Sequence, residues 1–283
     1  MSPDRRTMTL SGGGELSFVV AGEATGPTIL LLHGFPSSSR TFRNVIPIRA
    51  QDAFVIAPDM PGFGQSDVLA GPSFDAMADA VGELLEHLSV GERYIYLHDF
   101  GAPVGLRIAM QRPELVAGLI VQNANAHRTG LGPQWAATME YWEHPSKETE
   151  AAATAHLTPE GTRDQYVAGV PESIARRISP EVWEEDWRVM QLPGRMATQR
   201  ALIADYGRYV GQFDAIAGYF AESRPRGLMI WGRHDAFFDL AEIRSWLDAM
   251  PRMEAHILDA GHFVLETEAT RAAQLIAAFV EGR

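Results

Sequence analysis

The sequence predicts an α/β protein in which a mostly parallel sheet is flanked by helices on both faces. Short apolar runs that suit buried strands alternate with helical periodicity over residues 1–125, and the same alternation returns over residues 225–283. Residues 126–224 differ, because they show helical spacing, dense charges and many aromatic side chains but few strand signals. We therefore expect a core made of the two outer ranges and an inserted helical cap made of the middle range.

The expected core strands are short apolar segments bounded by turn-forming residues. They cover residues 15–21, 28–32, 53–57, 94–98, 115–122, 227–231 and 255–258. The expected core helices show apolar residues at helical spacing and cover residues 74–88, 104–111, 240–250 and 270–281. The glycine run at residues 12–14 has no phosphate-binding motif beside it, so we expect it to turn a hairpin.

The composition disfavours several classes of function. A formal net charge of −12 over 283 residues argues against nucleic acid and anionic membrane surfaces as partners, since both attract clustered Lys and Arg. The absence of cysteine excludes disulfides, thiolate zinc sites and a cysteine nucleophile. No apolar run approaches the roughly 20 residues of a membrane span, and the N-terminal residues lack the apolar stretch of a signal peptide. We expect a cytoplasmic protein.

A candidate nucleophile lies where the strand at 94–98 gives way to a helix. The strand ends at His98, and helical periodicity begins shortly afterwards, with Asp99 at the tip of the turn. Such a sharp strand-to-helix turn lifts one side chain above the sheet. The positive end of the following helix favours an ionised carboxylate there. The alternative is that Asp99 only caps that helix.

Two backbone N–H groups are expected beside this carboxylate. The segment His33-Gly34-Phe35-Pro36 follows an expected strand. Where a nucleophile stands on such a turn, the loop after an earlier strand provides one oxyanion-hole donor, and the residue after the nucleophile provides the other. Those donors would be Phe35 and Phe100. The alternative is an ordinary turn set by Gly34 and Pro36.

An acid and a histidine follow two later strands. Asp235 comes after the strand at 227–231, and His262 comes after the strand at 255–258. Open α/β sheets hold their sites at such carboxyl ends, and the order nucleophile, acid, histidine suits a catalytic triad on this turn. Asp235 would hold His262 in the right tautomer, and His262 would activate water. The alternative is a structural histidine, which is the commoner role of a lone histidine after a strand.

Other hydrolytic chemistries lack their motifs. No Gly-x-Ser-x-Gly occurs, and the nearest fragment, at residues 64–68, lacks the second glycine. No histidine pair has the helical spacing of a zinc protease. We therefore expect neither a serine nucleophile nor a metal ion, and no cofactor.

Four segments together resemble one branch of the α/β-hydrolase superfamily. They are His33-Gly34-Phe35-Pro36, Asp59-Met60-Pro61-Gly62-Phe63-Gly64-Gln65-Ser66, His98-Asp99-Phe100-Gly101-Ala102 and Asp259-Ala260-Gly261-His262-Phe263. Their combination is similar to epoxide hydrolases and haloalkane dehalogenases, and the resemblance covers nearly the whole chain outside the cap. It implies the α/β-hydrolase fold with an inserted cap. It also implies a mechanism in which Asp99 attacks carbon and forms an ester, which water activated by His262 then hydrolyses.

The resemblance favours an epoxide over a halide as the reacting group. Haloalkane dehalogenases commonly have tryptophan after the aspartate and asparagine in the earlier loop, where this chain has Phe100 and Phe35. Fluoroacetate dehalogenases carry arginines just after the aspartate, where this chain has Phe100 and Pro103. Both dehalogenase patterns therefore lose a needed side chain. An epoxide instead needs a proton for its leaving oxygen, which cap tyrosines supply in the family.

Cap residues at two places resemble the paired donors of epoxide hydrolases. We expect Tyr206 first and Tyr141 second to protonate the epoxide oxygen, with Trp142 as a donor or a wall. Tyr209, one helical turn from Tyr206, is the rival donor. The alternative is that these aromatic side chains only pack the cap. The expected substrate-binding residues are His33, Trp142 and Phe263.

The sequence thus predicts an epoxide hydrolase-like enzyme that converts a small, mainly apolar epoxide to a vicinal diol. Two alternatives remain open. One is a haloalkane or haloacid dehalogenase that uses the same triad. The other is a hydrolase-fold ligand-binding protein of low turnover, in which the triad would be misaligned. The sequence carries no indication of the oligomeric state.

Overall fold

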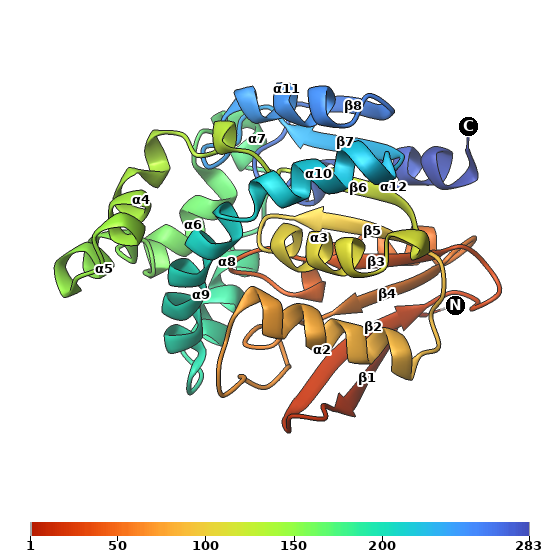
Figure 1. Ribbon diagram of the computed structural model, residues 1–283, viewed down its shortest axis with the longest axis horizontal. Coiled ribbons are helices and arrows are strands. Elements are labelled where there is room, and N and C mark those ends of the chain that lie inside the picture. Colours follow the sequence, from red (N-terminus) through yellow and green to blue (C-terminus); the bar gives the residue numbers. More distant parts are fainter. Residues whose placement is uncertain (1, 283) are drawn as a thin grey trace.

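An eight-stranded sheet forms the centre of the protein within residues 2–282, the part of the chain described by a computed structural model (Figure 1). The strand order is β1-β2-β4-β3-β5-β6-β7-β8. Strands β3 to β8 run parallel to one another, whereas β2 is antiparallel to both of its neighbours. The predicted fold class, a mostly parallel sheet flanked by helices, is confirmed.

The strands match their expected positions closely. They cover Asp4–Thr9 (β1), Glu15–Ala21 (β2), Thr28–Leu32 (β3), Phe54–Pro58 (β4), Arg93–His98 (β5), Val116–Gln122 (β6), Gly227–Gly232 (β7) and Met253–Leu258 (β8). Every expected strand is present, with ends displaced by at most two residues. The bounds are predictable because buried parallel strands are continuous apolar runs.

The edge strand β1 was not expected from the sequence. Its residues are mostly exposed and show no alternation of apolar and polar side chains. It pairs with β2 across the glycine run, where the Leu10 N–H donates to the Gly14 carbonyl at 3.0 Å. The expected hairpin turn at residues 12–14 is therefore confirmed.

Apolar clusters cover the two faces of the sheet, since neighbouring residues of a strand point to opposite sides. In β3, Leu30 and Leu32 join a cluster with side chains of α2 and α3, whereas Ile29 and Leu31 join one with side chains of α1 and α12. The flanking helices include α1 (Ile46–Arg49), α2 (Phe74–His87), α3 (Gly101–Gln111), α11 (Leu240–Ala249) and α12 (Leu265–Glu281). Helix α12 begins before the expected residue 270 and bends at Glu268, where φ is −126°.

Residues 126–224 hold helices and short turns but no strand. The helices are α4 (Ala136–Glu143), α5 (Lys147–Ala153), α6 (Pro159–Val167), α7 (Glu172–Ala175), α8 (Glu181–Met190), α9 (Arg195–Val210) and α10 (Phe213–Ser223). We call α4 to α9 the inserted helices. Figure 1 shows α4, α5, α6, α8 and α9 beyond the end of the sheet at which β5 terminates, whereas α10 packs beside α3 and α11. The last helix of this range therefore belongs, by its packing, to the layer that flanks the sheet.

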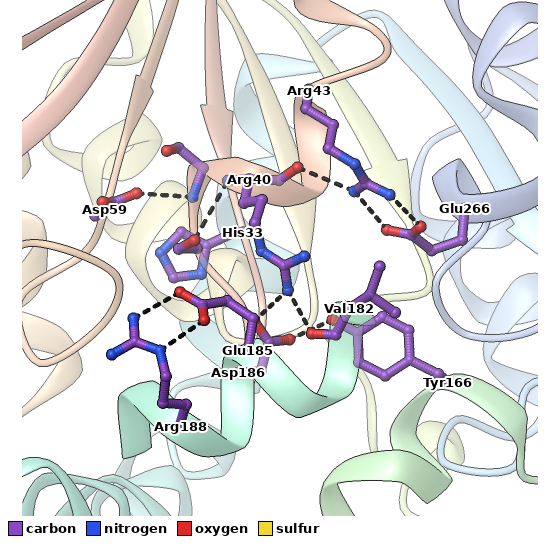
Figure 2. A network of polar contacts seen from close by, with 12 residues as sticks. His33, Arg40, Arg43, Asp59, Tyr166, Val182, Glu185, Asp186, Arg188 and Glu266 are labelled. Atoms are coloured by element: carbon purple, nitrogen blue, oxygen red, sulfur yellow. Dashed lines mark hydrogen bonds and ion pairs between the residues drawn. The ribbon is translucent and has the colours of Figure 1, made fainter. Parts of the chain in front are cut away.

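A polar network ties the inserted helices to the core (Figure 2). Arg40 lies in the short helical turn Ser39–Phe42 and donates to Asp186 of α8 at 2.8 Å, as well as to the Val182 carbonyl. Tyr166 of α6 donates its hydroxyl to the same carboxylate. Because Asp186 is buried, these two fixed donors replace the water that the carboxylate loses on folding.

Candidate active site

The turn from β5 to α3 places Asp99 at the carboxyl end of the sheet. Its φ of +48° lies in the left-handed region, which costs a residue other than glycine about 1–3 kcal/mol. Gly34 lies directly against this residue, because a Cβ at position 34 would stand 2.4 Å from the Cβ of Asp99. The strained turn and the absent side chain together bring the loop after β3 into contact with the carboxylate.

One oxygen of Asp99 is held by backbone. The Phe35 N–H donates to Oδ1 at 2.7 Å, and the backbone N–H of Phe100 lies near enough to the carboxylate to favour its charged form. Burial raises the pKa of Asp99, while the charge of His262 and the two N–H groups oppose that rise. The two expected oxyanion donors therefore meet at one side chain.

The other oxygen of Asp99 faces a histidine. Oδ2 lies 3.9 Å from Nε2 of His262, a nitrogen with no hydrogen-bond partner in the described chain. Nδ1 of His262 donates to Oδ2 of Asp235 at 3.0 Å, which fixes the tautomer whose Nε2 can accept a proton. Burial lowers the pKa of His262, but Asp235 and Asp99 raise it more strongly, so that it lies above its usual value.

Asp235 is itself held by donors from two loops. Its Oδ2 accepts from the side-chain amide of Asn123 at 2.7 Å, and its Oδ1 accepts from the Phe237 N–H at 2.8 Å. Asn123 follows β6, and its amide oxygen accepts from the Gly232 N–H at 2.8 Å, while its carbonyl accepts from the Asp99 N–H at 3.3 Å. Asn123 therefore links the turn that carries Asp99 to the acid Asp235. Sequence reasoning missed it, although a polar residue directly after a buried strand was the available signal.

A second buried imidazole lies beside the triad. His98 ends β5, and its ring centroid lies 4.8 Å from that of His262. Neither of its ring nitrogens has a hydrogen-bond partner among the described residues. Burial, reinforced by His262, lowers the pKa of His98 well below its usual value. His98 is therefore neutral and adds no positive charge next to the histidine of the triad.

A cavity of about 150 Å³ contains Asp99 in its wall. The residues that line it come from the sheet end and from the inserted range: Phe35, Asp99, Phe100, Gln134, Trp135, Thr138, His156, Gln165, Ile203, Tyr206 and Phe237. A larger surface hollow of about 460 Å³, beside α8, contains no member of the triad. The smaller cavity is therefore the candidate active site, because it alone of the two contains a residue of the triad.

Tyr206 is the expected cap donor that lines this cavity. It belongs to α9, is buried, and its hydroxyl has no hydrogen-bond partner in the described chain. Burial raises the pKa of Tyr206 well above its usual value, with Tyr209 and Asp99 adding to the rise. The nearby amide of Asn125 lowers the pKa of Tyr206 by a smaller amount, although it makes no hydrogen bond to the Tyr206 hydroxyl. The Tyr206 hydroxyl is therefore protonated and free to donate to a ligand.

The other expected cap donors lie outside the cavity wall. Trp142 stacks on Tyr206 and donates its N–H to the Ile203 carbonyl at 2.8 Å. Tyr141 is half-buried against the apolar core cluster. The rival donor Tyr209 gives its hydroxyl to the carbonyl of residue 125. Trp142 and Tyr209 are therefore bonded within the protein, and Trp142 supports Tyr206 from behind.

Two expected substrate-binding residues also lie behind the site. Nε2 of His33 accepts from the Met60 N–H at 3.0 Å, and its Nδ1 bonds to the Gly34 carbonyl at 3.1 Å. Burial lowers the pKa of His33 to about 4. Phe263 stacks on Tyr166 with ring centroids 4.0 Å apart. Neither His33 nor Phe263 lines the cavity, because each packs beneath the loop or strand end that carries the site.

Within residues 2–282, no group of three or more His, Asp or Glu side chains is arranged to hold a metal ion. The same part of the chain has no helix whose length and apolar character would let it cross a membrane.

Comparison with known proteins places the chain in a class. Residues 27–269 match the family model described as the alpha/beta hydrolase fold. An uncharacterized hydrolase of Saccharomyces cerevisiae is 34% identical over 270 residues, which cover 92% of each chain. Haloalkane dehalogenase 2 of Mycobacterium tuberculosis is 28% identical, over 90% of this chain and 88% of that protein. Among solved structures, the epoxide hydrolase CorEH without ligand has a TM-score of 0.80 at 24% identity, over 99% of both chains.

The chain therefore belongs to the alpha/beta hydrolase fold family. It is a hydrolase of this fold, 28% identical in sequence to a haloalkane dehalogenase, and its fold resembles that of an epoxide hydrolase. The predicted resemblance of the chain to the α/β-hydrolase superfamily, in the branch that holds epoxide hydrolases and haloalkane dehalogenases, is confirmed.

Proposed function

We propose that the protein hydrolyses an epoxide to a vicinal diol through an ester on Asp99. One observation carries this proposal: the two oxygens of that carboxylate have different surroundings. The Phe35 N–H holds Oδ1, while Oδ2 lies beside Nε2 of His262. Oδ1 is thus placed to become the ester carbonyl oxygen, and Oδ2 is placed to form the bond to carbon.

In the first step, Oδ2 of Asp99 attacks one carbon of the epoxide ring. The carbon–oxygen bond at that carbon breaks, and its electron pair goes to the ring oxygen. This oxygen takes a proton from the Tyr206 hydroxyl, which the raised pKa keeps protonated until then. His156 lines the same cavity, and burial lowers its pKa so that it is neutral. Its imidazole is a second group able to hydrogen-bond the leaving oxygen.

In the second step, water cleaves the ester. Nε2 of His262 takes a proton from water, and the oxygen attacks Cγ of Asp99. Negative charge develops on Oδ1, which the Phe35 and Phe100 N–H groups stabilise. The intermediate then collapses, Oδ2 leaves with the diol, and His262 returns its proton to that oxygen. The carboxyl proton of Asp99 restores Tyr206, so protons balance over the cycle.

The cavity wall supports an epoxide rather than a halide. A departing halide needs N–H or O–H donors around it, and tryptophan indoles are strong candidates for that role. Here the indole N–H of Trp135 donates to the Phe237 carbonyl at 2.8 Å, and that of Trp142 donates to the Ile203 carbonyl. Both are therefore occupied, whereas the Tyr206 hydroxyl is not. We accordingly assign the inserted helices α4 to α9 the role of a cap that carries the proton donor.

Two other functions remain as outcomes of the test. Dehalogenation by the same triad is favoured by the 28% identity to haloalkane dehalogenase 2 over most of the chain. A binding protein of low turnover would tolerate a misaligned triad. The 3.0 Å bond between His262 and Asp235 counts against that alternative.

The decisive experiment traps the ester. His262→Gln removes the base of the second step and leaves Asp99 in place, so the covalent adduct is expected to accumulate. The variant is incubated with a mixture of terminal epoxides and, separately, with haloalkanes, and the mass of the intact protein is recorded. A gain equal to one whole epoxide, which disappears when Asp99→Ala is added, is the expected result.

The control is a histidine outside the site. His256 lies on β8 and pairs with Glu254, so His256→Gln is expected to turn over substrate normally and to accumulate no adduct. A gain equal to an alkyl group without its halogen would establish the dehalogenase instead. No adduct from either set would contradict the proposed mechanism and favour the binding protein.

A further inference from the structure

Three polar side chains of the cavity wall have no hydrogen-bond partner in the protein. Gln134, Thr138 and Gln165 all line the cavity, and their side chains make no hydrogen bond within residues 2–282. Thr138 and Gln165 are buried, with only 8% and 7% of their surface exposed. Buried amides and hydroxyls in folded proteins are nearly always hydrogen-bonded. The polar atoms of these three side chains are not enclosed by protein but open onto the cavity, where a bound molecule can supply the missing partner.

These groups come from separate elements that surround one small space. Gln134 lies in the turn Pro133–Trp135, Thr138 in α4 and Gln165 in α6. Asp99 lines the same cavity from the sheet end. Because the cavity measures only about 150 Å³, a molecule that fills it contacts this polar wall as well as the carboxylate.

The charges of the wall limit the ligand further. No Lys or Arg stands among the described residues that line the cavity. Burial lowers the pKa of His156 and raises that of Tyr206, so both are neutral. An anionic ligand would therefore lie beside the Asp99 carboxylate without a compensating cation, which is costly in a buried site. The wall suits an uncharged molecule that carries hydrogen-bonding groups.

We infer that the substrate is a small, uncharged epoxide with a hydroxyl or amide substituent next to the ring, and that Gln165 and Thr138 bind this substituent. The inference rests on the proposed function. The aromatic side chains Phe35, Phe100 and Trp135 pack against the carbon skeleton. Amide and hydroxyl side chains that pair with a substrate hydroxyl reject the analogue that lacks it, because they are then left unpaired in a dry site. The inference thereby restricts the expected class of small, mainly apolar epoxides to those that carry one polar group.

A pair of epoxides of equal size tests this inference. Glycidol and butylene oxide differ only by a hydroxyl in place of a methyl group. After correction for the uncatalysed rates, the unmodified enzyme is expected to show a kcat/KM for glycidol at least about 10-fold above that for butylene oxide. In Gln165→Leu the preference is expected to vanish, and in Thr138→Val it is expected to shrink.

The matched control is another buried glutamine of the inserted helices. Gln199 of α9 is fully buried and its amide lacks a partner, but it does not line the cavity. Gln199→Leu is therefore expected to keep the preference for glycidol, even if the variant is less stable. A loss of preference in Gln199→Leu equal to that in Gln165→Leu would overturn the assignment of Gln165.

The possible outcomes separate this inference from the proposed function. Equal or better turnover of butylene oxide by the unmodified enzyme overturns the inference while epoxide hydrolysis stands. A preference for the anion glycidate over glycidol overturns it as well. If neither neutral epoxide is turned over or forms an adduct with His262→Gln, the proposed function is overturned and the inference falls with it.

Discussion

The sheet end and the inserted helices contribute to the site in contrasting ways. Asp99, Asp235 and His262 each follow a strand, and each is held by hydrogen bonds to its neighbours. Tyr206 and Gln165 come from helices of the inserted range, and their polar groups are unpaired in the described chain. At the sheet end each residue of the triad is fixed by at least one hydrogen bond, and Nε2 of His262 is left free for the reaction, whereas the side chains from the inserted helices still have hydrogen bonds to make to a ligand.

This difference separates chemistry from recognition. Groups that must move protons in a fixed order benefit from being locked in place, because reorganisation during the reaction is costly. Groups that recognise a substrate must stay free of hydrogen bonds within the protein, so that they can bond to the substrate. The contrast predicts that changes at the sheet end abolish turnover, whereas changes in the inserted helices alter rate or preference by smaller factors.

The largest effect on turnover is expected when the carboxylate of Asp99 is removed. Asp99→Gly should lower kcat by about 10⁴-fold or more, because no nucleophile remains. The same change should raise the free energy of unfolding by about 1 kcal/mol, since glycine adopts the φ of +48° without strain. Turnover assays and urea unfolding measure the two effects.

A left-handed residue outside the site provides the control for this variant. Ser89 has a φ of +55° just after α2, so Ser89→Gly should stabilise the fold and leave turnover unchanged. An Asp99→Gly enzyme that still hydrolyses epoxides would contradict the role of this carboxylate and the contrast drawn from it.

The next largest effect is expected at the acid of the triad. Asp235→Asn should lower kcat by about 10³–10⁴-fold, because an amide no longer fixes the productive tautomer of His262. The pH profile should change as well. Asp235 raises the pKa of His262, and the base must be neutral, so the rate of ester hydrolysis rises with pH through that raised pKa. Without the charge, the rise should move to lower pH in single-turnover measurements.

A rise at unchanged pH in Asp235→Asn would mean that another group sets the pKa of His262. The comparison requires the same buffer series for both enzymes, with circular dichroism to confirm that each stays folded over the range.

A smaller effect is expected in the inserted helices. Tyr206→Phe should slow adduct formation by about 10²-fold, since general acid catalysis contributes about 10²–10⁴-fold, and His156 remains as a second donor. Tyr141→Phe, in a helix outside the cavity wall, should leave the rate unchanged. Rapid-quench kinetics with intact-mass detection in the His262→Gln background measure the rate of adduct formation directly. Equal losses in both variants would contradict the assignment of Tyr206.

The smallest effect on turnover is expected at the polar network that connects α8 to the core, where the change should instead lower stability. Asp186→Asn should lower the free energy of unfolding by about 1–3 kcal/mol, because it weakens buried charge-assisted hydrogen bonds from Arg40 and Tyr166. Glu185→Gln, at the exposed pair with Arg188 in the same helix, should leave stability unchanged within error. Thermal unfolding compares the two variants. Equal decreases in their unfolding temperatures would contradict a stabilising role for the buried hydrogen bonds of Asp186.

The sequence predicts the sheet end well because strand ends are easy to locate. A buried strand is an apolar run, and the first polar residue beyond it marks the carboxyl end of the sheet. Asp99 and Asp235 stand just past buried strands, whereas His262 follows the mostly exposed edge strand β8. Asn123 follows the same rule but belongs to no motif, and β1 lacks the apolar run altogether.

The inserted helices are harder to predict, because helical spacing does not reveal which face meets the sheet. In α4, Thr138 faces the cavity, while Tyr141, one turn later, and Trp142 do not. His156 stands in the loop between α5 and α6, and Gln165 is a polar residue buried in a helix of otherwise unremarkable pattern. Their positions depend on how loops pack the helices together, which a single sequence does not reveal.

The hydrogen bond from Phe35 to Oδ1 has a consequence for the fate of individual oxygen atoms. In the proposed reaction, the oxygen given to the diol always comes from the position beside His262, and an oxygen from solvent takes its place. In water enriched in oxygen-18, the oxygen that Asp99 delivers to the first diol from each enzyme molecule would be oxygen-16. The oxygen that Asp99 delivers in later turnovers would be oxygen-18. Oδ1 would keep its original atom throughout, so Asp99 would acquire one heavy oxygen and never two.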